Sequence, residues 1–219
     1  MKKLKLLVAS LLVVAITVSV GHIYHHYYIH RFDQLIVKVS HKYGLDPLLI
    51  RSVVYEESHF DPEARSSAGA IGLMQITPII VKEWSRVTGK QELILDFPDH
   101  FHHLSNKEKL KLSEEELLTN PEINLSLGCW YIDQLSQRYA SLEEPLPIIL
   151  ASYNAGPANA QRWKGKVSRY TRSMTTDEYI QQIDFPETKN YVQRIIHRYK
   201  KGKKSMNEFN RNGWLFNID

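Results

Sequence analysis

The stretch "YEESHFDP", residues 55–62, places two adjacent glutamates at the end of an otherwise apolar helix. That helix is expected to begin at Asp46, a favoured capping residue followed by a proline at the first helical position. Three aliphatic residues recur along it at the spacing of one helix face, and Glu57 continues that series. Glu56 points to the flank. The helical phase therefore separates the two glutamates.

A carboxylate on the core-facing side of a helix is costly to ionise, because burial removes the water that solvates its charge. Burial raises the pKa of such a group, as a general acid working near neutral pH requires. Glu57 is therefore the candidate catalytic acid, and Glu56 is an ordinary flank residue, either paired or solvated. The alternative is that Glu57 only caps a backbone group or pairs with Arg51 or Arg65.

Two later segments supply polar side chains suited to a carbohydrate. "AGAIGLMQITP", residues 68–78, combines small residues, which permit close backbone approach, with the amide of Gln75, which both donates and accepts. "ASYNAGP", residues 151–157, places Tyr153 and Asn154 at the end of an apolar helix. A tyrosine there can hydrogen-bond a carboxylate or a substrate oxygen, and core packing is the alternative.

The rest of the chain is also helical in its periodicity, and no run alternates for long enough to predict a sheet. We expect a mainly α domain over residues 33–203, with two short helices around Phe185 and Pro186 at its end. Residues 89–119 are polar and charge-rich and are expected to form a surface insertion, with a capped helix start at Ser113. Residues 204–219 are expected to be a C-terminal tail.

The N-terminus has the pattern of an export signal or a membrane anchor. Three lysines within the first five residues precede an apolar run from Leu6 to Val20, which is short beside the roughly 20 residues of a full span. Because no A-x-A cleavage pattern follows, an uncleaved anchor over residues 1–21 is favoured over a cleaved signal. Residues 22–32 would then be a juxtamembrane linker, and the remainder would lie outside the cytoplasm.

Composition excludes several other classes. A charged fraction of 24% and a hydrophobic fraction of 43% are typical of globular domains, and the net charge of +4 only weakly favours an anionic partner. No zinc-finger spacing or basic stripe indicates nucleic-acid binding.

The single cysteine, Cys129, excludes an internal disulfide and is expected to be buried. The i, i+4 histidines His22, His26 and His30 lack a carboxylate or cysteine partner, so no metal site is expected.

Four blocks occur in one order: "EESHFDPEARSSAGAIGLMQITP", "NPEINLSLGCWYIDQL", "LASYNAGP" and "DFPETKNYV". Together they resemble the lysozyme-like lytic transglycosylases of the soluble-lytic-transglycosylase (SLT) type, over about residues 33–200 apart from the insertion. Four ordered blocks are far more specific than any one of them. The resemblance implies a lysozyme-like helical domain with a substrate groove and no need for a metal or cofactor.

The resemblance also implies roles for individual residues. The glutamate directly before the serine in the first block would be catalytic, which is Glu57, and Ser58 would support it. Tyr153 and Asn154 would stand across the cleft, with the tyrosine near the catalytic carboxyl. Glu187 matches the family's Glu-Thr pair in the last block. The wall of the substrate groove would be formed by Gly72, Leu73, Met74 and Gln75.

The last block departs from the family pattern. Many members carry an acidic residue six positions before the glutamate of the Glu-Thr pair and a proline three positions before it. This chain has Gln181 and Asp184 at those positions. We therefore expect no catalytic role for Asp184.

The activity that the resemblance implies is cleavage of peptidoglycan between N-acetylmuramic acid and N-acetylglucosamine, leaving 1,6-anhydromuramic acid ends. The expected partners are glycan strands, the membrane through the N-terminal segment, and cell-envelope machinery. One alternative is a lysozyme-type hydrolase, which needs a second carboxylate such as Asp61 or Glu63; Asp61 more plausibly caps a turn. Another is a non-catalytic peptidoglycan-binding protein, which would be expected to lose Glu57, Gln75 or Tyr153.

Overall fold

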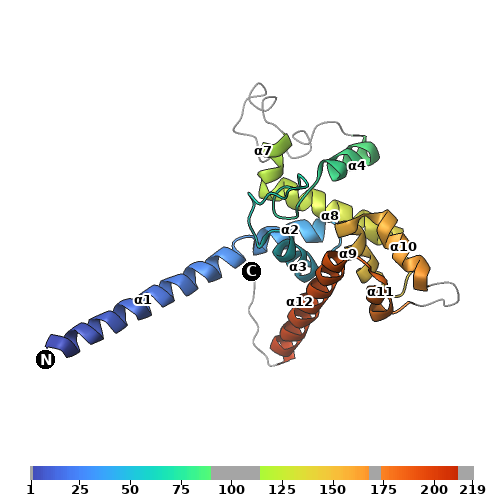
Figure 1. The fold of residues 1–219 in the computed structure, drawn as a ribbon. Coiled ribbons are helices and arrows are strands. Elements are labelled where there is room, and N and C mark those ends of the chain that lie inside the picture. The colour runs from blue at the N-terminus through green and yellow to red at the C-terminus, as the bar shows by residue number, and fades with distance from the viewer. Residues whose placement is uncertain (1, 90–113, 168–173, 212–219) are drawn as a thin grey trace, which may run out of the picture.

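The computed structural model describes residues 2–89, 114–167 and 174–211, and within these ranges it contains helices and two isolated β-bridges but no strand (Figure 1). This confirms the mainly α fold class. The helices are α1 (Lys2–His30), α2 (Asp33–Lys42), α3 (Pro47–Ser58), α4 (Pro78–Thr88), α7 (Glu114–Thr119), α8 (Pro121–Arg138), α9 (Leu146–Ala155), α10 (Pro157–Val167), α11 (Thr176–Gln182) and α12 (Pro186–Arg211).

Helices α3, α8, α9 and α12 form the centre of the body. Helix α12 packs against α3 and α9, while α8 packs against α2, α4, α7 and α9. Every residue of α8 from Ile123 to Trp130 is buried. Helix α8 therefore supplies an inner layer against which α2, α4, α7 and α9 pack.

Helix α3 begins where the sequence indicates. The side chain of Asp46 accepts a hydrogen bond from the backbone N–H of Leu48, and Pro47 occupies the first helical position. The helix ends after Ser58, where His59 and Phe60 both adopt left-handed backbone conformations with φ of 51° and 64°. Such conformations cost side-chain-bearing residues about 1–2 kcal/mol each, so the end of α3 is a strained turn.

Asp46 also ties the start of α3 to α12. Its carboxylate lies 2.6 Å from Nζ of Lys203 and accepts a hydrogen bond from the hydroxyl of Tyr199 at 2.9 Å. At the other end of α3, Glu57 contacts Tyr191 of α12. Helix α12 therefore runs antiparallel to α3 and is bound to both ends of α3.

The buried side chain of Asn124 in α8 makes several of the hydrogen bonds that hold the loop between α3 and α4. Its Oδ1 accepts from the backbone N–H of Met74 at 2.7 Å, and its Nδ2 donates to the carbonyls of Ile71 at 2.7 Å and Leu118 at 2.8 Å. Gly72 adopts φ of 81° directly beside it. An added Cβ at Gly72 would lie 2.3 Å from Nδ2 of Asn124, so this position requires glycine.

The thiol of Cys129 is buried, as expected from the sequence. Its residue is 0% exposed, and burial raises its pKa to about 12.

The last helix is longer than expected. Of the two short helices expected around Phe185 and Pro186, the one that follows them is α12, which continues through Gly202 to Arg211. It therefore extends beyond the boundary expected at residue 203. The glycine is tolerated there because α12 still packs on α3 at this point, where an added Cβ would sit 3.7 Å from Leu48.

Most of the expected insertion, including the capped helix start at Ser113, lies outside the described residues. Its end is described and forms α7.

Helix α1 projects away from the body (Figure 1). Its last turn is attached through Arg51, which donates to the carbonyl of Ile29. Arg31, directly after the helix, donates to the carbonyl of Phe60. Its aliphatic side chains from Leu11 to Val20 are well exposed. Among the described residues, no helix has the length and apolar character needed to cross a membrane.

Candidate active site

Glu57 lies in the last turn of α3, with its carboxyl turned toward α12. The hydroxyl of Tyr191 donates a hydrogen bond of 2.6 Å to its Oε1. Desolvation by burial raises the pKa of Glu57 to about 7; the Tyr191 hydrogen bond opposes this rise, and the neighbouring charge of Glu56 adds to it. Glu57 is therefore protonated in a large fraction of molecules near neutral pH, as a general acid must be.

Two buried tyrosines surround this carboxyl. Tyr191 of α12 is 4% exposed and Tyr153 of α9 is 9% exposed. Burial, and then the charge of Glu57, raise the pKa of both phenols well above the usual value, so both remain protonated donors. Tyr191 donates to Glu57, whereas Tyr153 donates to the backbone carbonyl of Met74 at 2.7 Å.

Tyr191 entered the sequence argument only as part of the matching block "KNYV". The signal that could have singled it out was a tyrosine near the start of a long amphipathic helix. Nothing in the sequence shows that this helix packs against α3, and without that packing the contact with Glu57 cannot be inferred. The residue in direct contact with the candidate acid is therefore one that the sequence analysis did not select.

The side chain of Ser58 hydrogen-bonds backbone carbonyls and not the carboxyl of its neighbour. Its Oγ donates to the carbonyls of Val54 at 3.1 Å and Leu73 at 2.9 Å. It thereby joins the end of α3 to the loop that precedes α4. Leu73 and Met74 are themselves 0% exposed, so their side chains lie in the core and not on an open groove wall.

Gln75 is the third residue near the site with a left-handed backbone, at φ of 49°. Its Nε2 donates to the carbonyls of Ala64 and Gly72, both at 3.1 Å, so its donors fix the loop. In the described residues, the non-glycine positions with positive φ are Gln75 in this loop and His59 and Phe60 just after α3. Strain of this kind persists only where the surrounding structure enforces it, and it is frequent at functional sites.

Asn154 and Glu187 lie near the junction of α9 and α12. Oδ1 of Asn154 accepts a 2.7 Å hydrogen bond from the hydroxyl of buried Thr188. Glu187 is exposed in the first turn of α12. The structure therefore brings Asn154 to the helix that carries Tyr191, and leaves Glu187 on the surface.

Two other carboxylates considered from the sequence, Asp61 and Asp184, are engaged elsewhere. Oδ1 of Asp61 accepts from the backbone N–H of Glu63 at 3.0 Å, which confirms its expected role in a turn. Asp184 is bound by Arg162, Lys166 and the indole of Trp163, and these contacts hold its pKa well below the usual value. In the described part of the chain, Glu56 is the carboxylate whose negative charge raises the pKa of Glu57.

A hollow of about 480 Å³ opens between α4 and α8. Its lining includes Ile79, which is 77% exposed, Tyr131 of α8 and Pro157 at the start of α10. The ring of Tyr131 lies 5.7 Å from the ring of Tyr153. The hollow therefore adjoins the aromatic side of the candidate site.

The family model for the transglycosylase SLT domain matches residues 34–175, about two thirds of the chain. The chain therefore belongs to the transglycosylase SLT domain family.

Individual relatives and solved structures agree with this membership. The chain is 34% identical over 129 residues to membrane-bound lytic murein transglycosylase F of Desulfosudis oleivorans, covering 58% of this chain and 22% of the relative. It is 33% identical over 113 residues to membrane-bound lytic murein transglycosylase E of Buchnera aphidicola, covering 51% of this chain and 42% of the relative. The X-ray structure of an inactive glutamate-to-glutamine mutant of lytic transglycosylase Slt from Pseudomonas aeruginosa matches 82% of this chain and 25% of its own, with a TM-score of 0.61 and 27% identity.

The chain spans about a fifth to two fifths of the length of the two curated relatives. What they share with it is this helical body.

Proposed function

We propose that the protein is a peptidoglycan lytic transglycosylase that cleaves the β-1,4 bond between N-acetylmuramic acid and N-acetylglucosamine. The observation that carries the proposal is Glu57, a part-buried carboxyl whose pKa is raised to about 7 by desolvation and which accepts a hydrogen bond from Tyr191. The names of the relatives, which are lytic murein transglycosylases, supply the substrate class. The inactive Slt mutant, in which glutamine replaces a glutamate, supports a catalytic glutamate in this family.

The chemistry is that of one group acting first as an acid and then as a base. Protonated Glu57 gives its proton to the glycosidic oxygen, and the bond from that oxygen to C1 of the muramic acid breaks. The 2-acetamido group of the substrate assists at C1. The resulting Glu57 carboxylate then takes the proton of the muramyl 6-hydroxyl, while the oxygen of that hydroxyl bonds to C1. The product is a 1,6-anhydro ring, no water is consumed, and Glu57 is protonated again.

The hydrogen bond from Tyr191 assigns the two oxygens of Glu57. Because the phenol donates to Oε1, that oxygen is an acceptor and the transferable proton resides on Oε2. A glycan strand bound at Oε2 can extend over Tyr131 into the hollow between α4 and α8.

The products of digestion test the reaction. Purified peptidoglycan treated with the protein should release muropeptides with 1,6-anhydromuramic acid ends, which mass spectrometry separates by one water from reducing ends. The matched control is the same digestion by a muramidase. Reducing ends throughout would instead assign the lysozyme-type hydrolase, and the absence of any release would leave a binding function.

Tyr191→Phe tests the assignment of the hydrogen bond. Removing the phenol removes the contact that lowers the pKa of Glu57, so that pKa should rise further. Since the protonated form starts the reaction, the decline of kcat/KM with increasing pH, expected around pH 7 in the natural protein, should move to higher pH. We expect kcat at pH 6 to fall about tenfold as well, because the carboxyl loses its orientation.

Tyr153→Phe is the control for that experiment. Tyr153 donates to the carbonyl of Met74 and not to Glu57, so its loss should leave the position of the pH decline nearly unchanged. A pH profile of Tyr191→Phe that coincides with that of the natural protein would contradict the role given to Tyr191.

We also propose that α1 holds the domain at the outer face of the cytoplasmic membrane. The supporting observations are its exposed aliphatic side chains, which surround the helix, and the lysines that precede them in the sequence. Peptidoglycan lies outside that membrane, so this position suits the substrate. Recovery of the protein in the soluble fraction without removal of residues 1–21 would contradict it.

A further inference from the structure

Glu56, next to the candidate acid, is bound by two arginines of α12. Its side chain is only 9% exposed, and its Oε1 lies 2.6 Å from the guanidinium of Arg194. Its Oε2 accepts a 3.3 Å hydrogen bond from Arg198. A carboxylate this enclosed is retained only with such partners, because an unpaired buried charge is strongly destabilising.

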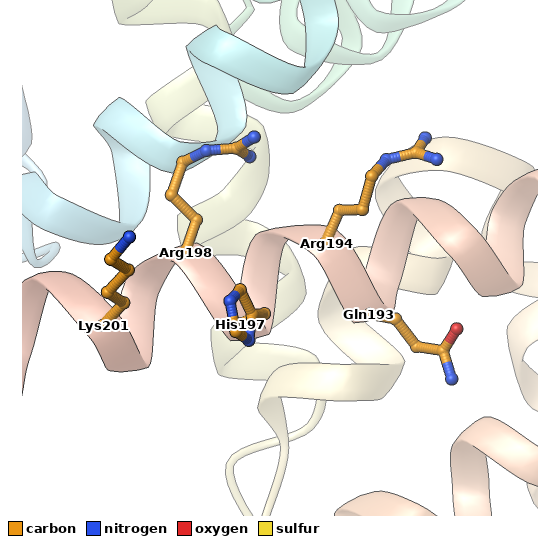
Figure 2. Close-up of a pocket in the computed structure, with 5 residues that line it drawn as sticks. All are labelled: Gln193, Arg194, His197, Arg198 and Lys201. Carbon is orange, nitrogen blue, oxygen red and sulfur yellow. The ribbon is translucent and has the colours of Figure 1, made fainter.

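Both arginines line a surface hollow of about 450 Å³ on α12, and Figure 2 shows how they leave the helix. Arg194 and Arg198 extend toward the neighbouring helix layer, whereas Gln193 points the opposite way. The guanidinium of Arg198 also lies 3.9 Å from the ring centre of Tyr55, one turn before the end of α3. The two arginines therefore belong to the interface between α12 and α3.

The same face of α12 carries Tyr191. Residues 191, 194 and 198 follow the i, i+3, i+7 spacing of one helix face. One end of this face hydrogen-bonds Glu57, and the next turn binds Glu56. A shift of α12 relative to α3 would thus move both contacts together.

We propose that Glu56, Arg194 and Arg198 form a positioning unit that fixes α12 on the end of α3, and so holds Tyr191 on the carboxyl of Glu57. The unit also compensates a negative charge next to the group that must carry a proton. The expected changes in kcat rest on the proposed function, whereas the expected changes in the titration of Glu57 do not. None of the three residues is expected to touch the reacting atoms.

The groups that face Glu57 determine the expected pH behaviour. They are Tyr191 from α12, Tyr153 from α9 and Glu56 from α3 itself, with Arg194 and Arg198 standing behind Glu56. The charge of Glu56 raises the pKa of Glu57. Removing the arginines and removing the charge should therefore shift the titration of Glu57 in opposite directions.

The test compares two variants in the full chain. In Arg194→Gln/Arg198→Gln the charge of Glu56 is left uncompensated, and the titration of Glu57 should move up by about 0.5–1 pH unit. The value of kcat should fall about three- to tenfold with KM nearly unchanged, because Tyr191 is displaced. In Glu56→Gln the charge is removed, so the titration should move down. The amide oxygen of glutamine still accepts from an arginine and keeps part of the positioning contact, so kcat at pH 6 should fall by less than in the arginine variant, about threefold at most.

Lys203→Gln is the matched control, because its ion pair with Asp46 also joins α12 to α3, but at the far end of α3. It should leave both kcat and the titration unchanged. The titration is followed by ¹³C NMR of labelled glutamate carboxyls as well as by the pH profile of kcat/KM. Adding Glu56→Gln to the double arginine variant should reverse the part of the upward shift that comes from the uncompensated charge of Glu56.

Two results would overturn the proposal. The first is an arginine double variant that behaves like Lys203→Gln, since the contacts would then only stabilise the fold. The second is a shift of the same sign in both test variants. If no activity is found in any variant, including the natural protein, the proposed function fails while the NMR titration still tests the positioning unit.

Discussion

Glu57→Gln is expected to abolish the release of muropeptides, with a loss of at least about a thousandfold. A general acid alone contributes about 10²–10⁴ to a rate, and Glu57 serves as acid and then as base. Glutamine keeps the shape of the side chain and an oxygen that accepts from Tyr191, so the loss would be chemical and not structural. The measurement is turnover of purified peptidoglycan at pH 6, where the natural residue is protonated. Glu56→Gln, one residue away, is the control and should lose no more than about threefold, because its amide oxygen still accepts from an arginine of α12.

The same variant should be more stable than the natural protein above pH 7. The pKa of Glu57 is about 7 in the folded state against an ordinary value of 4.5, so the folded state binds more protons between these values. The free energy of unfolding of the natural protein therefore falls as the pH rises from about 4.5 to about 7, and then levels off. Glu57→Gln lacks this decline. At pH 8 it should gain on the order of 2 kcal/mol, allowing for partial exposure, and near pH 4 the difference should vanish.

Retention of turnover in Glu57→Gln would remove Glu57 from its role, whatever its stability. A stability difference between Glu57→Gln and the natural protein that does not vary with pH would contradict the raised pKa of Glu57, but not its catalytic role. The two readouts therefore separate the chemical assignment from the electrostatic one.

Gly72→Ala should destabilise the protein by more than about 3 kcal/mol. Its φ of 81° already disfavours any side chain, and the new Cβ would lie 2.3 Å from Nδ2 of Asn124 and 2.7 Å from the carbonyl oxygen of Leu118. Relief requires Asn124 to move, which breaks hydrogen bonds to buried backbone groups at a cost of about 1–3 kcal/mol each. The measurement is the midpoint of denaturant-induced unfolding.

Gly69→Ala separates the clash from the backbone strain. Gly69 has a similar φ of 79°, but nothing lies within 4 Å of an added Cβ. Its substitution should cost only about 1–2 kcal/mol. Equal destabilisation of the two variants would show that Asn124 yields readily, contrary to the role given to it here.

The parts of the fold that the sequence predicted are those set by local rules. Asp46 and the proline after it define the start of α3, and the phase of that helix separates Glu57 from Glu56. Helical periodicity predicted the mainly α fold class. The family resemblance depended on four short blocks, each contiguous in sequence, and on their order along the chain.

The parts that the sequence did not predict depend on partners far apart in the chain. Tyr191 meets Glu57 across 134 residues, and Asn124 meets the backbone of Met74 across 50. Helical periodicity indicates which face of an element is buried, but not what it is buried against. For the same reason Met74 was expected on a groove wall, although α8 encloses its side chain completely.

Because Cys129 is buried, the rate at which its thiol is labelled measures transient opening of the core in the natural chain. With a pKa raised to about 12 and no exposed surface, this single thiol is essentially unreactive toward aromatic disulfide reagents while the core is closed. Labelling at one site per molecule then occurs only when the centre of the body opens, at a rate that measures how often it does so. The variants discussed above can be ranked in this way without an added probe, even in the presence of detergent or lipid.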